Sequence, residues 1–128
     1  MHKKLLIVSA FFAVLSVILG AFAAHALADV LSLKQHKTFE TAARYQMYHS
    51  LAMALCSILY LHKPSKIIVQ AAISFGIGII LFSGSLYTLV FLNLYNVEGL
   101  KFIAALTPIG GVCFILGWLL IIKAAIKW

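Results

Sequence analysis

An uncharged run at residues 67–94, IIVQAAISFGIGIILFSGSLYTLVFLNL, is the longest in the chain and is broken only by Gln70. A helix that crosses the hydrocarbon core of a bilayer needs about 20 mostly apolar residues. This run is longer than that and leaves room for the helix to tilt. We therefore expect a membrane-spanning helix here.

The composition of the whole chain agrees with a membrane location. Of its 128 residues, 64% are hydrophobic, ten are Lys or Arg, three are Asp or Glu, and the mean hydropathy is +1.09. Soluble domains are about 45–50% apolar and about 25% charged, and a soluble fold of this size has too little interior for so much apolar surface. A soluble enzyme, a disordered protein and a nucleic-acid-binding domain are disfavoured. The net charge of +7 reflects scarce acids, not a basic patch.

Three further apolar stretches have spanning length or nearly so: residues 5–24, 45–62 and 102–122. Together with 67–94 they predict an all-α integral membrane protein. We expect one transmembrane domain over residues 1–128, built as an antiparallel bundle of four transmembrane helices. The first stretch ends near Ala24-His25-Ala26, which resembles a signal-peptidase site, but we expect it to be retained because it is longer than a usual signal core.

An amphipathic segment is predicted at about residues 33–44, before the second span. Ser32 and Gln35 have the spacing of a capping box, in which each side chain accepts a hydrogen bond from the other residue's backbone N–H group. Phe39 and Ala42 begin an apolar stripe that continues into the span. Glu40 and Arg44 lie one turn apart, in the order that favours an ion pair.

The basic residues predict the orientation. With four spans, the side of the two termini carries six of them, Lys3, Lys4, Lys63, Lys66, Lys123 and Lys127, and the other side carries Lys34, Lys37, Arg44 and Lys101. Lys and Arg accumulate on the cytoplasmic side of membrane proteins. We therefore expect a protein of the inner (plasma) membrane with both termini in the cytoplasm.

Small residues recur at helical spacing and predict where the helices approach closely, because lipid supplies no hydrophobic drive between helices. The predicted packing positions are Ser16, Gly20, Ala24, Gly76, Gly78, Gly84, Gly110, Gly111 and Gly117. The same faces are also able to join copies of the chain, so a homo-oligomer is expected.

Polar side chains gather at a similar depth, in the half of the spans remote from the termini. Polar groups inside spans are costly and are functional candidates. The predicted cluster comprises His25, Glu40, Arg44, Tyr45, His49, Ser83, Ser85, Tyr87 and Thr107. It has two interpretations: a hydrogen-bond network that locks the helices together, or a binding site for a small molecule, a lipid or a partner.

Enzymatic and metal chemistry have less support. His25 and His49 allow a haem or metal hypothesis, and Cys56 and Cys113 a redox pair, but no set of ligands accompanies them. The chain has no G-x-S-x-G motif. We expect a non-enzymatic protein with no metal and no cofactor that binds a ligand at the cluster. A small oligomeric channel, a transporter or a transport accessory is the alternative, and a membrane redox or haem protein a lower one.

Four motifs also carry a resemblance, one for each span: GAFAAHAL at 20–27, TAARYQMYH at 41–49, FSGSLY at 82–87 and TPIGG at 107–111, followed by Gly117-Trp118. In this order they resemble the domain-of-unknown-function family 423, also called the UPF0382 membrane family. Ala23 stands where that family often has a glycine. The resemblance implies a small inner-membrane protein with four spans, and it implies no reaction.

Overall fold

A computed structural model describes residues 2–99 and 102–127, and every regular element in these ranges is helical. The elements are α1 (Lys3–His25), α2 (Leu33–His62), α3 (Lys66–Gly78), the π-helical segment η1 (Ile79–Ser83), α4 (Gly84–Leu94) and α5 (Phe102–Ile126). Because α3, η1 and α4 follow one another without a break, they form one rod, Lys66–Leu94.

The helices contain the four predicted stretches. The amphipathic segment and the second stretch are one helix, α2, which begins with the capping box expected from the sequence. The backbone N–H of Ser32 donates to Oε1 of Gln35 over 2.8 Å, and the backbone N–H of Gln35 donates to Oγ of Ser32 over 3.3 Å. These bonds satisfy backbone donors that the first turn of a helix otherwise leaves unpaired.

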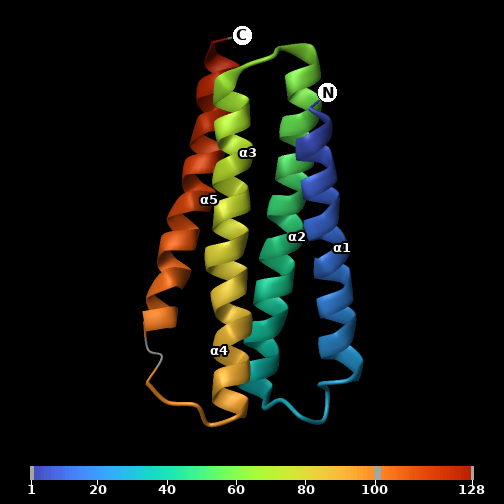
Figure 1. Cartoon of the computed structure of the whole chain (residues 1–128), viewed down its shortest axis with the longest axis vertical. Helices are drawn as coiled ribbons and strands as arrows, with labels where there is room; N and C mark the ends of the chain where they lie inside the picture. Colours follow the sequence, from blue (N-terminus) through green and yellow to red (C-terminus); the bar gives the residue numbers. More distant parts are fainter. Residues whose placement is uncertain (1, 100–101, 128) are drawn as a thin grey trace.

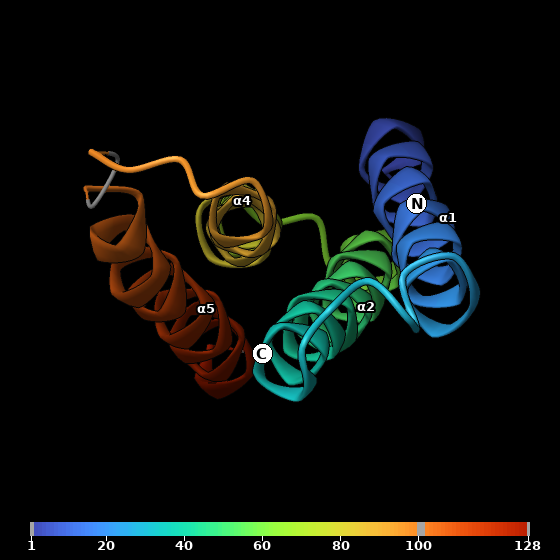
Figure 2. The ribbon, with the colours of Figure 1, turned by 90° about the horizontal axis from the view of Figure 1, so that it is seen from below.

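Along the chain, α1, α2, the α3–α4 rod and α5 run in alternating directions (Figure 1). Seen along the helices, α1 and α5 lie at the two edges of the arrangement, with α2 and the α3–α4 rod between them (Figure 2). Accordingly, α1 packs along α2, α5 packs along the rod, and α2 contacts the rod over α3, η1 and α4.

Three of the long helices are long and apolar enough to cross a membrane: α1, the rod Lys66–Leu94 and α5. The described chain is therefore an all-α membrane protein. Helix α2 is long enough to cross a membrane, but its mean hydropathy is lower than that of the other three because it carries polar side chains along its length. Several of them are buried against the neighbouring helices, namely Gln46, His49, Ser50 and Ser57.

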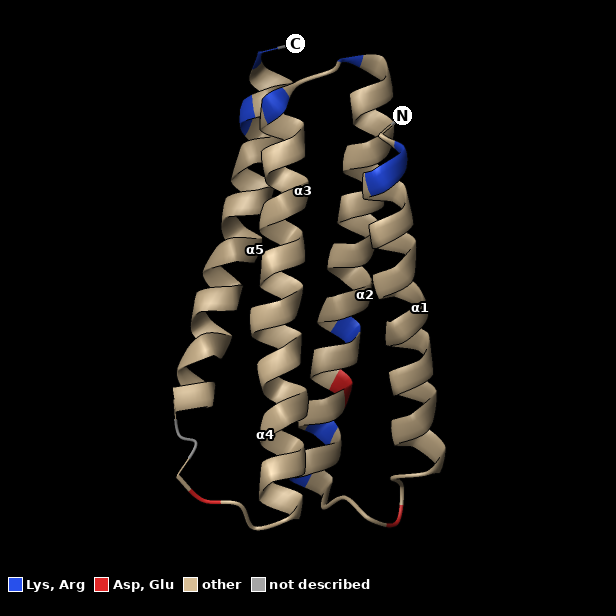
Figure 3. Ribbon diagram, in the orientation of Figure 1, with Lys and Arg blue, Asp and Glu red and all other residues tan. Residues whose placement is uncertain are grey.

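Charged residues occupy the two ends of the helices and part of α2 (Figure 3). Among the described residues, the charged residues at the end that holds both termini are lysines, whereas Asp29 and Glu98 lie in the turns at the opposite end and Glu40 lies two turns into α2. Lys101, which the sequence places on the opposite side, lies outside the described residues. The long middle parts of α1, the rod and α5 carry no charge.

Glycines permit the closest contacts, and these join α5 to the rod. A Cβ atom on Gly110 would overlap the backbone of Phe82, one on Gly117 would overlap the ring of Phe75, and one on Gly78 would overlap the ring of Phe114. Gly76 makes an ordinary contact with Met53, 3.6 Å from Cε. Ser16 is buried against α2.

Other predicted packing positions make no such contact. A Cβ atom on Gly20 or Gly84 would have no neighbour within 4 Å, and one on Gly111 would lie 4.0 Å from the ring of Phe82. Ala24 is exposed and its neighbour Ala23 is buried instead. In the C-terminal part of α1, the side of the helix that contains Ala23 packs against α2. Gly20 and Ala24 lie on a different side of α1, so they do not contact α2.

Candidate functional site

A buried glutamine connects three helices at the centre of the predicted polar cluster. Nε2 of Gln46, on α2, donates to the backbone carbonyl of Phe12 on α1 over 2.9 Å. Its Oε1 accepts a hydrogen bond from the hydroxyl of Tyr87 on α4 over 3.0 Å. The hydroxyl of Ser50 donates to the carbonyl of Gln46 over 2.6 Å. Gln46 is 3% exposed, so it joins α1, α2 and α4 inside the protein.

Two serines attach further helices to the backbone of α2 beside Gln46. Oγ of Ser16, on α1, donates to the carbonyl of Ala43 over 2.7 Å. Oγ of Ser83, in η1, donates to the carbonyl of Ala42 over 2.8 Å. Both carbonyls lie in the turn of α2 before Gln46. In this part of the predicted cluster the polar groups are therefore paired with one another and with the backbone of α2. Such a network is typical of hydrogen bonds that hold helices together.

A separate pair of hydroxyls connects the rod with α5. Oγ of Ser85 lies 2.6 Å from Oγ1 of Thr107, and Oγ of Ser85 also donates to the carbonyl of Phe82 over 2.9 Å. The structure thus brings Ser85 and Thr107 together, as the sequence predicts, but on the side of the rod that faces α5. They take no part in the network around Gln46.

The charged members of the predicted cluster lie outside it. His25 is exposed at the end of α1, and Arg44 is exposed on α2. The carboxylate of Glu40 lies 3.7 Å from Nδ1 of His36, one turn earlier on α2. Within residues 2–99 and 102–127 we find no ion pair between Glu40 and Arg44, although their spacing favours one.

Tyr45 and His49 lie one turn apart on the side of α2 that faces α5 and the rod. The ring of His49 stacks on that of Phe114 with a centroid distance of 3.5 Å and an interplanar angle of 4°. The ring of Tyr45 stacks on that of Phe82 with a centroid distance of 4.9 Å. Trp118 meets His49 edge-on, with the centroids 6.4 Å apart. The two residues thus belong to an aromatic cluster.

The two ring nitrogens of His49 differ in their hydrogen bonding to the described residues. Its Nδ1 lies 2.8 Å from the carbonyl oxygen of Tyr45, and since a carbonyl only accepts, Nδ1 carries the hydrogen. Nε2 of the neutral ring is then an acceptor, and it has no hydrogen-bond partner among the described residues. Every fully buried side-chain nitrogen and oxygen of those residues has one, so Nε2 is not fully buried, although His49 as a whole is only 6% exposed. The hydroxyl of Tyr45, a residue that is 39% exposed, also lacks a described partner.

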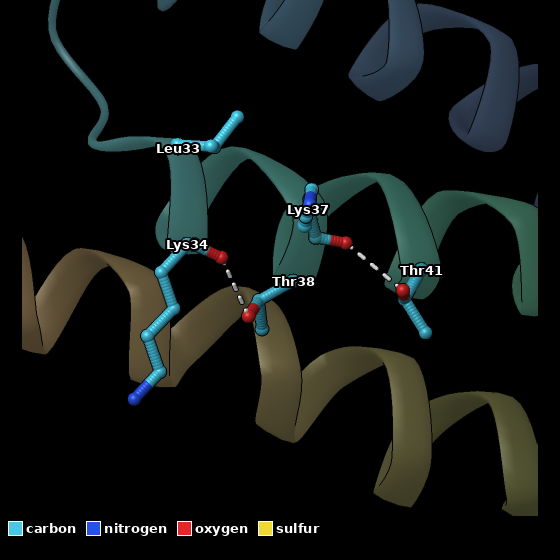
Figure 4. Close-up of a pocket in the computed structure, with 5 residues that line it drawn as sticks. All are labelled: Leu33, Lys34, Lys37, Thr38 and Thr41. Carbon is cyan, nitrogen blue, oxygen red and sulfur yellow. Dashed lines mark hydrogen bonds between the residues drawn. The ribbon is translucent and has the colours of Figure 1, made fainter.

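A hollow of about 390 Å³ lies on α2 beyond the cluster (Figure 4). Its lining comes from one helix only: Leu33, Lys34, Lys37, Thr38 and Thr41. The hydroxyls of Thr38 and Thr41 donate to the carbonyls of Lys34 and Lys37. The two lysine side chains point in different directions, so they do not converge on one ligand (Figure 4). This hollow is a weaker candidate than the Tyr45–His49 pair.

The described residues contain no group of three or more His, Cys, Asp or Glu side chains that is able to hold a metal ion. Cys56 and Cys113 are free thiols on different helices. Gln46, the most connected polar residue, was not among those predicted from the sequence. Its signal was its spacing from Phe39, Ala42 and Ala43, which places it on the buried stripe of α2.

Comparison with known proteins supports the resemblance. Residues 19–111 match the model of a family described as a protein of unknown function, DUF423. The chain is 40% identical over 126 residues to a UPF0382 membrane protein of Staphylococcus epidermidis, with 98% of each chain covered. It is 38% identical to the UPF0382 membrane protein YwdK of Bacillus subtilis, again with 98% of each covered.

The similarity extends to Escherichia coli, whose UPF0382 inner membrane protein YgdD is 32% identical over 125 residues, covering 98% of this chain and 91% of YgdD. No solved structure matches the chain significantly. The family model spans most of the chain and the relatives align along nearly all of it. The chain therefore belongs to the DUF423 family of membrane proteins, also named UPF0382.

Proposed function

We propose that the chain crosses the plasma membrane four times, with α2 as the crossing that composition alone does not identify, and with both termini in the cytoplasm. Helix α2 lies between α1 and the rod (Figures 1 and 2), so it extends through the same depth as they do. Its polar groups Gln46, Ser50 and Ser57 are buried between helices. Buried, satisfied polar groups are tolerated inside a membrane.

Cysteine labelling tests this topology. In a chain with Cys56 and Cys113 replaced by alanine, a single cysteine is placed at Asp29 or at Pro64, exposed positions in the turns at the two ends of α2. A membrane-impermeant maleimide added to intact cells is expected to label Asp29→Cys, and to label Pro64→Cys only after permeabilisation. The reverse pattern would overturn the orientation, and labelling of both positions in intact cells would overturn the four crossings.

The same proposal assigns the protein a non-enzymatic binding function at the Tyr45–His49 pair, for a small molecule or lipid dissolved in the membrane. The observation that carries it is Nε2 of His49, an acceptor that is not fully buried and that has no hydrogen-bond partner among the described residues. A hydrogen-bonding atom that faces lipid has no water to pair with. A ligand that donates a hydrogen bond to Nε2 removes this cost, whereas the polar groups around Gln46 are already paired.

The surroundings of Nε2 indicate the chemistry of the ligand. Phe114, Phe82 and Trp118 supply aromatic faces and edges around the pair. The hydroxyl of Tyr45, one turn away, adds a group that both donates and accepts. A flat apolar molecule that carries a hydroxyl group fits this combination, because aromatic rings prefer offset stacking or edge-to-face contact with such a body.

A long-chain alkylphenol is a suitable probe, and Trp118 is the reporter. Trp128→Phe leaves Trp118 as the remaining tryptophan, since the chain has two. Binding of 4-octylphenol is followed by the fluorescence of Trp118 in detergent micelles. His49→Phe keeps the stacking on Phe114 and removes Nε2. One lost hydrogen bond in a membrane protein is worth about 0.6–1.7 kcal/mol, so we expect about 3-fold to 20-fold weaker binding.

Tyr48→Phe is the matched control, because Tyr48 is also an exposed tyrosine of α2 and its hydroxyl has no described partner. It is expected to leave binding unchanged, whereas Tyr45→Phe weakens it. Equal binding by the wild type, His49→Phe and Tyr45→Phe would contradict the proposed site. Saturable binding that all three variants weaken alike would also contradict it, since that result would reflect a general change of the protein.

A further inference from the structure

Two hollows follow one another along one face of α3, on the side of the protein that faces α1. The first, of about 400 Å³, is lined at the end of the termini by Tyr60, Lys66 and Gln70, among others. The second, of about 350 Å³, continues toward Ile73 and Ile80. Lys66 and Gln70, which line the first hollow, and Ile73 and Ile77, which line the second, follow one another three or four positions apart, so they lie on one face of α3.

The second hollow is entirely apolar except for the lysine at its edge. Val8 and Phe12 of α1 form one wall, Ile73 and Ile77 of α3 form the other, and Met53 of α2 lies between them. Gly76 opens this hollow because it has no side chain to fill it. Isoleucines 73 and 77 are each about half exposed, so the hollow is an open groove toward the lipid.

The mouth of the groove carries positive charge and an unpaired amide. Lys4 lines the second hollow with the apolar stem of its side chain, and Lys66 lines the first. Gln70 is exposed, one turn further along α3, and its amide has no hydrogen-bond partner among the described residues. No acid lines either hollow. Such a mouth is complementary to an anionic group that also accepts hydrogen bonds.

We propose that this groove binds an anionic phospholipid, with its phosphate between Lys4, Lys66 and Gln70 and one acyl chain along Met53 and Gly76. From Lys66 to Ile80 the helix rises by about 21 Å at 1.5 Å per residue. This exceeds half of the hydrocarbon thickness of about 30 Å, so the groove accommodates an acyl chain from one leaflet. The groove is lined by α1, whereas the Tyr45–His49 pair packs on α5, and the two sites share no residue.

Native mass spectrometry of the full chain, released from detergent micelles, tests the proposal. The probes are phosphatidylglycerol and phosphatidylcholine with the same acyl chains. We expect phosphatidylglycerol to be retained in preference. A lysine near a membrane surface contributes about 1 kcal/mol to the attraction of anionic lipid. Lys4→Gln and Lys66→Gln are therefore each expected to lower the affinity for phosphatidylglycerol about fivefold, with little effect on phosphatidylcholine.

Gly76→Leu fills the apolar part of the groove and is expected to abolish retention of both lipids. Its matched control is Gly20→Leu, which adds the same side chain where no atom lies within 4 Å of the Cβ position. Because Gly76→Leu is able to disturb packing on Met53, Ile77→Trp provides a second way to fill the groove from an exposed position.

Lys123→Gln is the charge control, since Lys123 lies at the same end on α5 and does not line the groove. A loss of affinity equal to that of Lys4→Gln would overturn the site in favour of diffuse attraction. Unchanged retention in both Gly76→Leu and Ile77→Trp would also overturn it. The proposal would also be overturned if the wild-type chain were a dimer and either variant were a monomer, because a second copy of the chain would then occupy the groove.

Discussion

Gln46 and Tyr87 are joined by a buried hydrogen bond of 3.0 Å between α2 and α4, and the same glutamine side chain donates to the carbonyl of Phe12 on α1. One residue therefore fixes the positions of both helices relative to α2. The bond to α1 matters most, because among the described helices α1 packs mainly against α2.

Replacing Gln46 by leucine is expected to lower the free energy of unfolding by about 1–3 kcal/mol. The change removes two side-chain hydrogen bonds, which in membrane proteins are worth about 0.6–1.7 kcal/mol each, and leaves the hydroxyl of Tyr87 without its acceptor. Unfolding in mixed detergent micelles, followed by circular dichroism, measures the loss. Gln70→Leu, at an exposed glutamine of α3, should change stability by less than 0.5 kcal/mol.

Two adjacent glycines of α5 are expected to respond oppositely to alanine. In Gly110→Ala the new Cβ overlaps the backbone of Phe82, which cannot move without displacing the rod, so we expect a loss of about 1–3 kcal/mol. In Gly111→Ala the nearest atom outside the helix is 4.0 Å away, and stability should be unchanged or slightly raised. Thermal denaturation of both variants in one detergent makes the comparison. A similar loss in both would show that α5 packs differently.

The contact between Ser85 and Thr107 is expected to couple the rod to α5 energetically. A double-mutant cycle of Ser85→Ala and Thr107→Val should give a coupling energy of about 0.6–1.7 kcal/mol, the range found for hydrogen bonds between membrane helices. The pair of Tyr87→Phe and Thr107→Val provides the comparison, since these residues share no hydrogen bond. Coupling in the second cycle and none in the first would reject the contact.

The capping box of α2 offers a test outside the apolar part of the chain. Ser32→Ala removes the acceptor of the Gln35 backbone N–H and should destabilise the first turn of α2 by about 1 kcal/mol. Amide hydrogen exchange at Gln35 and His36 should accelerate about fivefold, which corresponds to the same free energy. Ser32→Asp keeps an acceptor at this position and should restore slow exchange. Acceleration in Ser32→Asp as well would mean that the cap does not control the turn.

The sequence was informative where local rules decide the structure. The capping box at Ser32 depends on residues three positions apart, and the long apolar stretches depend on composition, so both were predictable. Small residues were less so. Gly20 and Gly110 have the same kind of spacing, but only Gly110 meets a neighbour, because periodicity says which residues share a face and not which face another helix covers.

The polar cluster was predictable as a region but not as a set of contacts. Ser83, Ser85 and Tyr87 lie within five residues of one another, and the structure divides them between two neighbouring helices: Ser83 and Tyr87 bond to α2, and Ser85 to α5. Gln46 was missed because it comes two residues after Arg44, just beyond the charged start of α2, where a polar residue is ordinary. These assignments depend on helix packing, which one sequence does not reveal.

The π-helical segment η1 determines which side chains of α4 face α2 and which face α5. The backbone N–H of Gly84 donates a hydrogen bond to the carbonyl of Ile79, five residues earlier, whereas in an α-helix the partner is four residues earlier. The segment therefore holds one residue more than an α-helical turn. Each residue of an α-helix turns the next by about 100°. The segment absorbs that extra residue within one turn, so α4 faces the same way as in an α-helix with one residue fewer. Deleting Leu81 would therefore leave an ordinary α-helical turn and keep Tyr87 beside Gln46 and Ser85 beside Thr107, whereas deleting a residue from a regular α-helical turn would rotate α4 by about 100° and separate both pairs.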